Sequence, residues 1–295
     1  MLPLLTALLI RAALPFPDAH TRALTEPPSS FAAAAPADDR ARFHALMAYA
    51  ADEGLASKPF GTIVQALGEQ LKGAPYAAGV LDVPADETLL APLDRFDCVL
   101  YVEAVLALAR GVAEGDSTYD GYLARVEQQR YRGGRMDGYG SRLHYFSDWV
   151  RDGEARGLVV DVTEAAGGVP FAKRLDFMTK HRSSYPQLAH AARFAEITRA
   201  EADLAGATRF YIPKARVHRA YADLQAGDVL ATTTDLAGLD VTHTGFAYDA
   251  GDGGIGFLHA SPTGGVKVSP DLARYLAGNP RQTGVYVIRP VDPRG

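Results

Sequence analysis

Apolar residues recur with helical spacing directly after Cys98. The i, i+3, i+4, i+7 repeat of one buried helix face is formed by Val102, Val105, Leu106 and Ala109. Asp97 stands immediately before this run, where a carboxylate often accepts the first free N–H groups of a helix. The pattern predicts a helix that begins at Cys98, with Asp97 as its N-cap.

Alternating positions later in the chain predict antiparallel strands. In residues 224–230 a Gly-Asp turn precedes a short apolar run. His243 occupies one face of residues 243–248, and His259 occupies one face of residues 255–261. If these two strands form a hairpin, the histidines can come close, because directly opposed residues lie about 5 Å apart.

A long stretch, at about 114–223, separates the predicted helix from these strands. Its periodicity predicts a helix over 116–130, a strand over 158–162 and a longer helix over 186–204. Near the C-terminus we expect Ser269 to cap a short helix and residues 284–289 to form the last strand. The stretch is therefore interpreted as a largely helical insertion.

Composition places the chain among globular proteins. It has 295 residues, of which 47% are hydrophobic and 22% are charged, enough to build a sizeable core. The 30 Lys and Arg against 35 Asp and Glu give a net charge of −5, which disfavours nucleic acid as a partner. A single cysteine forms no intramolecular disulfide, and without Cys-x-x-Cys pairs no structural zinc site is predicted. No cofactor is expected.

Residues 1–37 differ from the rest of the sequence. Residues 2–10 are apolar enough for the core of a signal peptide but too few to cross a membrane. We interpret residues 1–37 as a signal peptide and linker, which would place the protein in the periplasm or envelope of a bacterium. The alternative is a misplaced start codon and a cytoplasmic protein. Residues 38–295 are predicted to form one domain without an integral membrane segment.

Cys98 is the candidate nucleophile. At a helix N-terminus, free N–H groups and the helix dipole favour the thiolate, so we expect a pKa below the free value of about 8.5. His243 is the candidate base and His259 the group that orients it, and the three together are the parts of a cysteine amidase. The alternatives are a buried cysteine that packs as a small hydrophobe and histidines without a catalytic role.

Motifs that include these residues carry a family resemblance. They are residues 97–103 (DCVLYVE), 142–149 (RLHYFSDW), 181–186 (HRSSYP) and 243–246 (HTGF) with 258–261 (LHAS). The set resembles the NlpC-type papain-like peptidoglycan amidases, and within them the N-acetylmuramoyl-L-alanine amidase-like branch, first catalogued as a domain of unknown function. Family members commonly have Thr at Leu100 and Val at Thr244, and neither difference touches a reacting atom.

This resemblance implies a fold and a substrate. The fold is α+β, with a papain-like core in which the nucleophile helix packs on an antiparallel sheet, beside the insertion at about 114–223. The reaction is hydrolysis of the amide between N-acetylmuramic acid and L-alanine, with preference for the anhydro form in small peptidoglycan fragments (muropeptides), the expected partners of this chain.

Residues around the nucleophile are expected to contact the substrate. Tyr76 resembles the tyrosine that lines the cleft in this superfamily, and Asp97 lies next to Cys98. Arg142, His144 and Tyr145 supply hydrogen-bonding groups and aromatic surface suited to a sugar or a lactyl amide. The alternative for Tyr145 is that it belongs to a set of core aromatics.

Other functions remain open at this point. The same residues can cut a peptide bond within the stem or transfer an acyl group, because the chemistry up to the thioester is shared. A wall-binding protein without activity would keep the cleft but lack a reactive thiol. A metal hydrolase that uses His144, His243 and His259 is disfavoured, because no His-Glu-x-x-His motif is present.

Overall fold

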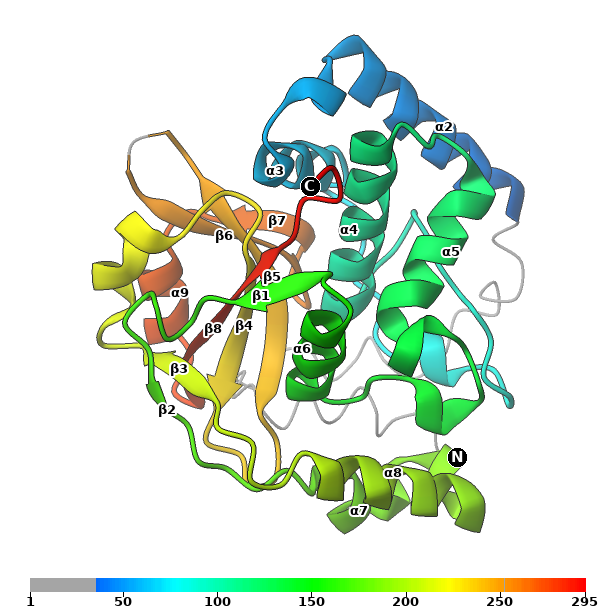
Figure 1. The fold of residues 1–295 in the computed structure, drawn as a ribbon, viewed down its shortest axis with the longest axis vertical. Coiled ribbons are helices and arrows are strands. Elements are labelled where there is room, and N and C mark those ends of the chain that lie inside the picture. Colours follow the sequence, from blue (N-terminus) through cyan, green and yellow to red (C-terminus); the bar gives the residue numbers. More distant parts are fainter. Residues whose placement is uncertain (1–35, 252) are drawn as a thin grey trace.

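An antiparallel sheet forms the centre of the computed structural model, which describes residues 36–251 and 253–295 (Figure 1). The strands are ordered β2-β3-β8-β4-β5-β6-β7, and β1 also pairs with β8. Their bounds are β1 Val159–Asp161, β2 Val169–Pro170, β3 Phe210–Pro213, β4 Val229–Thr234, β5 Val241–Asp249, β6 Ile255–Ser261, β7 Gly265–Ser269 and β8 Gln282–Pro290. Every residue of β4 and β6 is buried, because both faces of the sheet are covered.

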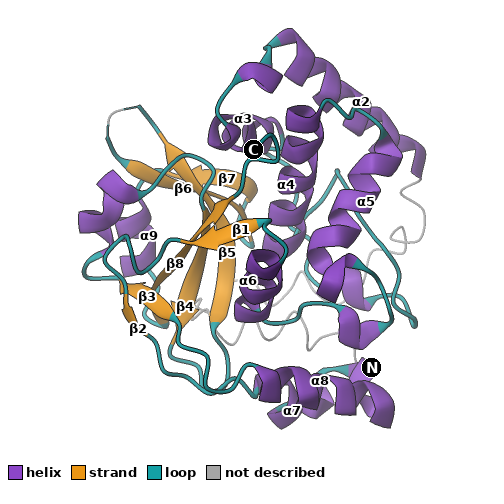
Figure 2. Cartoon of the chain, viewed as in Figure 1, coloured by secondary structure: helices purple, strands orange, loops and turns teal. Residues whose placement is uncertain are grey.

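Helices cover the two faces of the sheet (Figure 2). Their bounds are α2 Pro36–Asp52, α3 Phe60–Gln70, α4 Cys98–Glu114, α5 Tyr119–Arg130, α6 Phe146–Ala155, α7 Phe177–Lys180, α8 Ala191–Asp203 and α9 Leu272–Ala277. On one face α4 packs with Phe246 and Leu258, while on the other Leu272 of α9 packs with Phe257. The expected α+β architecture is confirmed.

Helix α4 begins as the sequence predicts. The Asp97 carboxylate accepts hydrogen bonds from the backbone N–H groups of Val99 and Leu100, at 3.0 and 2.8 Å. One turn later, the Tyr101 ring meets Phe246 of β5 edge-on at 5.8 Å, and its hydroxyl donates to the Gly68 carbonyl of α3 at 3.0 Å. These contacts fix the first turn of α4, and therefore Cys98, against the sheet.

The predicted β5–β6 hairpin is present, but its two strands pair over only part of their length. Their pairing runs from Asp249↔Ile255 to Phe246↔Leu258. Nearer His243, β5 pairs only with β4, which lies along its other edge, and a register shift there leaves Thr242 as a bulge. Bulges of this kind re-aim side chains and are frequent beside active sites.

The insertion is less helical than the sequence suggests. It holds α5 to α8, but it also contributes β1, β2 and β3 to the edge of the sheet. Its helices α7 and α8 lie together at one end of the molecule (Figure 1). Apolar residues of this part form their own cluster: Tyr139, Tyr145, Leu175, Phe177, Met178, Leu188, Ile197 and Leu204.

Three predicted boundaries are wrong, each because of a local cap or break. Helix α5 begins at Tyr119 rather than 116, since the Thr118 hydroxyl accepts the Gly121 N–H at 3.1 Å. The helix expected over 186–204 is a 3-10 turn followed by α8, because His190 has extended backbone. Asp271, not Ser269, caps α9 by accepting the Arg274 N–H at 2.6 Å, while Ser269 ends β7.

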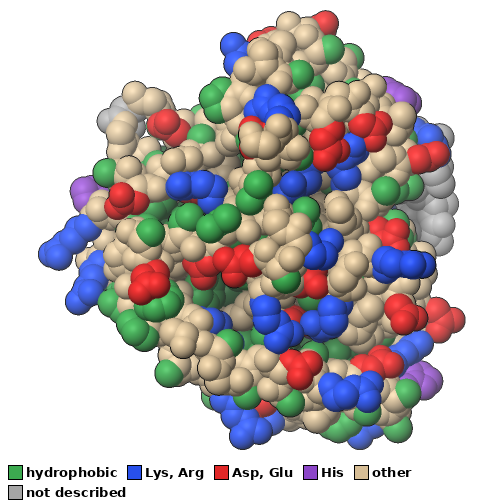
Figure 3. All heavy atoms as spheres, in the orientation of Figure 1, with side chains coloured by type: hydrophobic (Ala, Val, Ile, Leu, Met, Phe, Trp, Pro, Cys, Tyr) green, Lys and Arg blue, Asp and Glu red, His purple; other side chains and the backbone are tan. Residues whose placement is uncertain are grey.

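Basic and acidic side chains are interspersed on the face of the molecule drawn in Figure 3. Within the part of the chain that the structure describes, no helix is both long and apolar enough to span a bilayer. The predicted signal peptide and linker, residues 1–37, lie almost entirely outside the described residues.

Candidate active site

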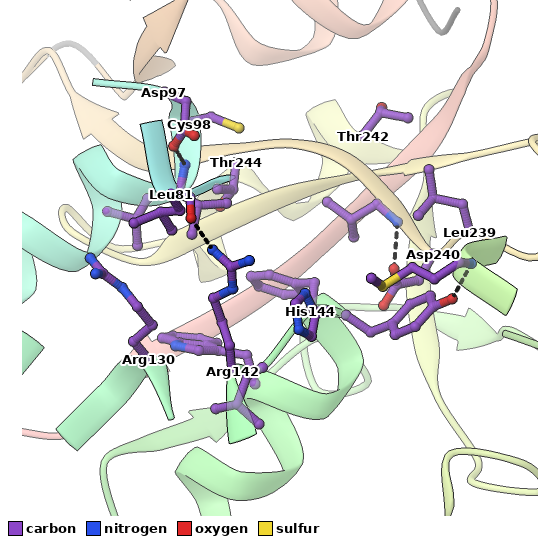
Figure 4. Close-up of a pocket in the computed structure, with 18 of the residues that line it drawn as sticks. Leu81, Asp97, Cys98, Arg130, Arg142, His144, Leu239, Asp240, Thr242 and Thr244 are labelled. Atoms are coloured by element: carbon purple, nitrogen blue, oxygen red, sulfur yellow. Dashed lines mark hydrogen bonds between the residues drawn. The ribbon is translucent and has the colours of Figure 1, made fainter. Parts of the chain in front are cut away.

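A cavity of about 290 Å³ lies between the start of α4, strand β5 and the insertion (Figure 4). Five of the predicted site residues line it together with the base candidate: Asp97, Cys98, Arg142, His144, Tyr145 and His243. In Figure 4, Arg142 reaches toward Leu81 on the side of the cavity where Cys98 lies, and His144 lies beside Arg142. Segments far apart in the sequence therefore meet at this cavity, whereas Tyr76 and His259 are not part of its lining.

The thiol of Cys98 is buried, with 5% of the residue exposed. Burial and the adjacent Asp97 carboxylate raise its pKa to about 12, while backbone N–H groups, first that of Thr244, act in the opposite direction. The expectation of a lowered pKa is therefore wrong. The favourable N–H groups of the helix start are outweighed because water is excluded and the capping carboxylate is itself next to the sulfur.

Asp97 is both the N-cap and part of the cavity wall. Burial, followed by the charge of Glu103, raises its pKa to about 6, although the Leu100 and Val99 N–H groups counteract this. One carboxylate oxygen accepts both capping hydrogen bonds. Its first role in the structure is thus to hold the start of α4.

The two histidines form a buried pair. His243 Nε2 and His259 Nδ1 lie 2.7 Å apart, with the rings nearly perpendicular at 85°. Burial lowers the pKa of His243 to about 4, and burial together with His243 lowers that of His259 to about 2. Both rings are therefore neutral near pH 7. Because Nε2 of His243 is occupied by His259, Nδ1 is the nitrogen left to serve a thiol.

The approach of the histidines depends on a glycine rather than on directly opposed positions. Continuing the β5–β6 register places Gly245, not His243, opposite His259. A Cβ atom on Gly245 would lie 2.7 Å from the His259 Cβ and 2.6 Å from the Leu258 carbonyl oxygen. The absence of a side chain here lets the His259 ring cross to His243.

Tyr76 lies beside the nucleophile, through a parallel bridge to Phe96. Burial, followed by the charges of Cys98 and Asp97, raises the pKa of its phenol. Within the described residues its buried hydroxyl has no hydrogen-bond partner. It is therefore a donor without a partner on the segment that pairs with Phe96, two residues before Cys98.

Arg142 lines the cavity, but carboxylates of the protein engage its guanidinium. It binds Asp82 at 2.9 Å and lies 3.6 Å from Glu87, and it also donates to the Leu81 carbonyl at 3.2 Å. Its side chain is only 8% exposed. These contacts hold the loop over residues 79–87 as one wall of the cavity.

Tyr145 and His144 differ in whether a hydrogen-bonding atom remains available to a substrate. The Tyr145 hydroxyl donates to Glu201 at 2.7 Å and accepts the Met178 N–H at 3.0 Å, so it joins α8 and α7. His144 Nε2 lies 2.9 Å from the Tyr139 carbonyl oxygen and must donate to it. Burial and Arg142 lower the pKa of His144 to about 3, which leaves Nδ1 as a permanent acceptor.

Sequence reasoning missed several residues around the site. Tyr275 of α9 meets the His259 ring edge-on at 5.1 Å, and Ser269 Oγ lies 3.1 Å from His259 Nε2. Arg130 forms a buried ion pair with Glu103 at 2.6 Å in the cavity wall. An apolar helix face that contains Glu103 was the only signal in the sequence for such a pair. Nothing local distinguishes Tyr275 or Ser269.

No group of three or more His, Cys, Asp or Glu side chains within residues 36–251 and 253–295 is arranged to hold a metal ion. His243 and His259 contact each other instead of converging on a common point. Among the described residues, His144, His243 and His259 therefore do not form such a group.

Comparison with known families identifies the group to which this chain belongs. A family model described as N-acetylmuramoyl-L-alanine amidase-like (AmiA-like) matches residues 66–285, more than half of the chain. The chain belongs to this family. The match spans α4, the insertion and the hairpin, and therefore the whole candidate site. The resemblance expected from the sequence is confirmed.

Several solved structures resemble the chain over most of its length. An N-acetylmuramoyl-L-alanine amidase from Bacteroides uniformis is 33% identical, with a TM-score of 0.73, over 78% of this chain and 98% of that one. A Bacteroides fragilis protein described as a candidate xylanase is 34% identical, with a TM-score of 0.67, over 75% of this chain and 98% of its own.

A Legionella pneumophila protein with a TM-score of 0.64 covers 86% of this chain and 94% of its own, but at 20% identity it supports the fold alone. No curated protein matches the chain.

Proposed function

We propose that this member of the amidase-like family is a cysteine amidase that cleaves N-acetylmuramic acid from L-alanine in peptidoglycan fragments, with preference for the anhydro form. The observation that carries the proposal is that Cys98 and His243 line one cavity, where His243 Nε2 also lies 2.7 Å from His259 Nδ1 behind it. The neighbour from Bacteroides uniformis supports the bond that is cut, since it is named for that activity.

The resting site holds a neutral thiol and a neutral imidazole. The proton of Cys98 therefore moves to Nδ1 of His243 as the sulfur attacks the lactyl carbonyl, rather than before the substrate binds. Developing imidazolium on His243 keeps its Nε2–H bond to His259. In this respect the pair replaces the His–Asp pair of serine proteases, with a neutral partner that orients but stabilises less charge.

Negative charge on the carbonyl oxygen needs donors close to the sulfur. The backbone N–H of Cys98, at the first position of α4, is one, and the unpaired Tyr76 hydroxyl is the other. His243 then gives its proton to the departing L-alanine amine, which leaves a thioester on Cys98. Water, deprotonated by His243, hydrolyses the thioester to the lactyl carboxylate and restores the thiol.

The free acceptor of His144 suggests how the substrate is oriented. Its Nδ1 can accept a hydrogen bond only from an N–H or O–H group, such as an acetamido N–H or a sugar hydroxyl. We therefore assign His144 to substrate binding, while Arg142 and Tyr145 support the walls.

The proposed core is papain-like: the helix with the nucleophile packs on an antiparallel sheet that carries the base. We place the enzyme in the bacterial envelope or periplasm, where peptidoglycan, the source of these fragments, is found. This placement rests on the amidase-like family and on the composition of residues 1–37.

Mass spectrometry after incubation with a defined anhydro-disaccharide-tetrapeptide tests the proposal, in water enriched in ¹⁸O. We expect a free tetrapeptide and an anhydro-disaccharide with one ¹⁸O in its lactyl carboxylate, and no turnover with Cys98→Ala. The reduced, non-anhydro disaccharide should react more slowly. A cut inside the tetrapeptide would instead show a stem endopeptidase, and transfer to an added amine would show an acyltransferase.

A further inference from the structure

The chain of side chains that begins at His243 continues past His259 to the end of strand β7. His259 Nε2 lies 3.1 Å from Ser269 Oγ, and Ser269 closes the strand that pairs with β6. We propose that Ser269 is a positioning residue that accepts the His259 Nε2–H and thereby keeps both imidazoles in the tautomers that the reaction needs. This inference rests on the proposed roles of His243 and His259.

The direction of the hydrogen bonds follows from the base. To take a proton at Nδ1, neutral His243 must carry its own proton on Nε2. That N–H points at His259 Nδ1, 2.7 Å away, which must then be a bare acceptor. The single proton of neutral His259 is consequently on Nε2, directed at Ser269 Oγ.

The opposite direction is also sterically possible and would disable the site. Ser269 would donate to His259 Nε2, the His259 Nδ1–H would donate to His243 Nε2, and His243 would carry its proton on Nδ1, where the thiol proton has to go. Once His243 is doubly protonated during attack, only the first direction remains, because two N–H groups cannot share one hydrogen bond. An acceptor at Ser269 therefore stabilises the transition state more than the resting state.

The surroundings of His259 make this choice matter. The residue is 1% exposed, so water has little access to an N–H without a partner. Lys267 lies opposite His259 in the β6–β7 ladder, and its charge, after burial and His243, contributes to keeping the ring neutral. A neutral ring has one N–H, and the nitrogen that carries it decides the direction of both hydrogen bonds, from His243 to His259 and from His259 to Ser269.

Replacement of Ser269 tests the proposal by kinetics. Ser269→Ala should lower kcat about 10- to 100-fold, the effect of leaving a buried N–H unpaired in the transition state, with little change in KM. Ser269→Thr keeps the hydroxyl and should restore most of the rate. Ser261→Ala is the matched control, because Ser261 ends the neighbouring strand and its hydroxyl contacts Thr263 rather than an imidazole.

A ¹⁵N NMR measurement of the imidazole nitrogens gives a second readout that does not depend on substrate. In the unmodified protein we expect His259 protonated on Nε2 and His243 on Nε2, and in Ser269→Ala a shift of both toward Nδ1. Wild-type His259 protonated on Nδ1 would overturn the proposal, as would full activity of Ser269→Ala. If His243→Ala remains active, the proposed function itself fails, which separates the two hypotheses.

Discussion

The two ends of the cavity are built differently. At the reaction end, Cys98, His243 and His259 belong to the first turn of a core helix and to central strands, and the polar atoms of the two histidines face each other. At the insertion end, Arg142 and Tyr145 direct their polar atoms into the protein, toward Asp82 and Glu201. A residue can therefore line the cavity without offering a polar atom to a substrate. Substitutions at both ends of the cavity are needed to tell the two kinds of residue apart.

The largest effect is expected from the base at the reaction end. His243→Ala should lower kcat/KM by about 10⁴-fold, since it removes the proposed acceptor of the thiol proton. His259→Asn should keep part of the rate, because its amide oxygen can still accept the His243 N–H. Steady-state kinetics with the disaccharide-tetrapeptide measure both. Equal loss in the two variants, with intact folding by circular dichroism, would mean that the histidines share the role of base.

A methyl group at Gly245 should displace the His259 ring without removing any polar group. The new Cβ would lie 2.7 Å from the His259 Cβ, so the ring must move. We expect Gly245→Ala to lower kcat about 100-fold, the usual result of a displacement near 1 Å. Gly278→Ala is the control, because its Cβ would meet nothing closer than 3.4 Å. Unchanged kcat in Gly245→Ala would show that this approach does not position the base.

At the insertion end, substitution of Arg142 should act mainly through stability. Arg142→Met leaves Asp82 and Glu87 without their buried cation, and we expect a loss of about 3 kcal/mol in the free energy of unfolding. KM should rise as the loop over 79–87 loosens, while kcat changes less. Urea denaturation and kinetics report the two effects. A higher KM with unchanged stability would instead indicate direct contact between Arg142 and the substrate.

The smallest effect is expected from changing pH near neutrality. The pKa of His243 is lowered to about 4, so the base binds a proton, and activity falls, only as pH drops toward 4. His144 at the insertion end stays neutral over the same range. Alkylation of Cys98 by iodoacetamide should keep rising above pH 8.5, because its pKa is raised to about 12. A plateau in alkylation below pH 8 would show a thiolate at rest.

The reaction end could be predicted because its signals are local. The helix at Cys98 and its Asp97 cap follow from spacing and from one adjacent side chain, and the hairpin follows from alternation around a tight turn. The contact between His243 and His259 was predicted for the wrong reason. The bulge at Thr242 and the space above Gly245 bring them together, and neither can be recognised without the packed sheet.

The insertion end was harder to predict because its polar groups pair over long distances. Asp82, which binds Arg142, lies 60 residues earlier in the chain, and Glu201, which binds Tyr145, lies 56 residues later. Sequence spacing carries no information on such pairs. The pKa of Cys98 could not be predicted for a similar reason. Its position at a helix start predicts a lowered pKa, but burial, which is known only from the fold, raises it.

A thiol that stays protonated until attack is also protected from oxidants. Peroxide reacts with the thiolate, and the raised pKa of Cys98 keeps the thiolate a minor form at pH 7. The chain has no second cysteine, so an oxidised Cys98 cannot be trapped in an internal disulfide. The burial that keeps this thiol protonated should therefore make Cys98 slower to oxidise than a cysteine that rests as a thiolate.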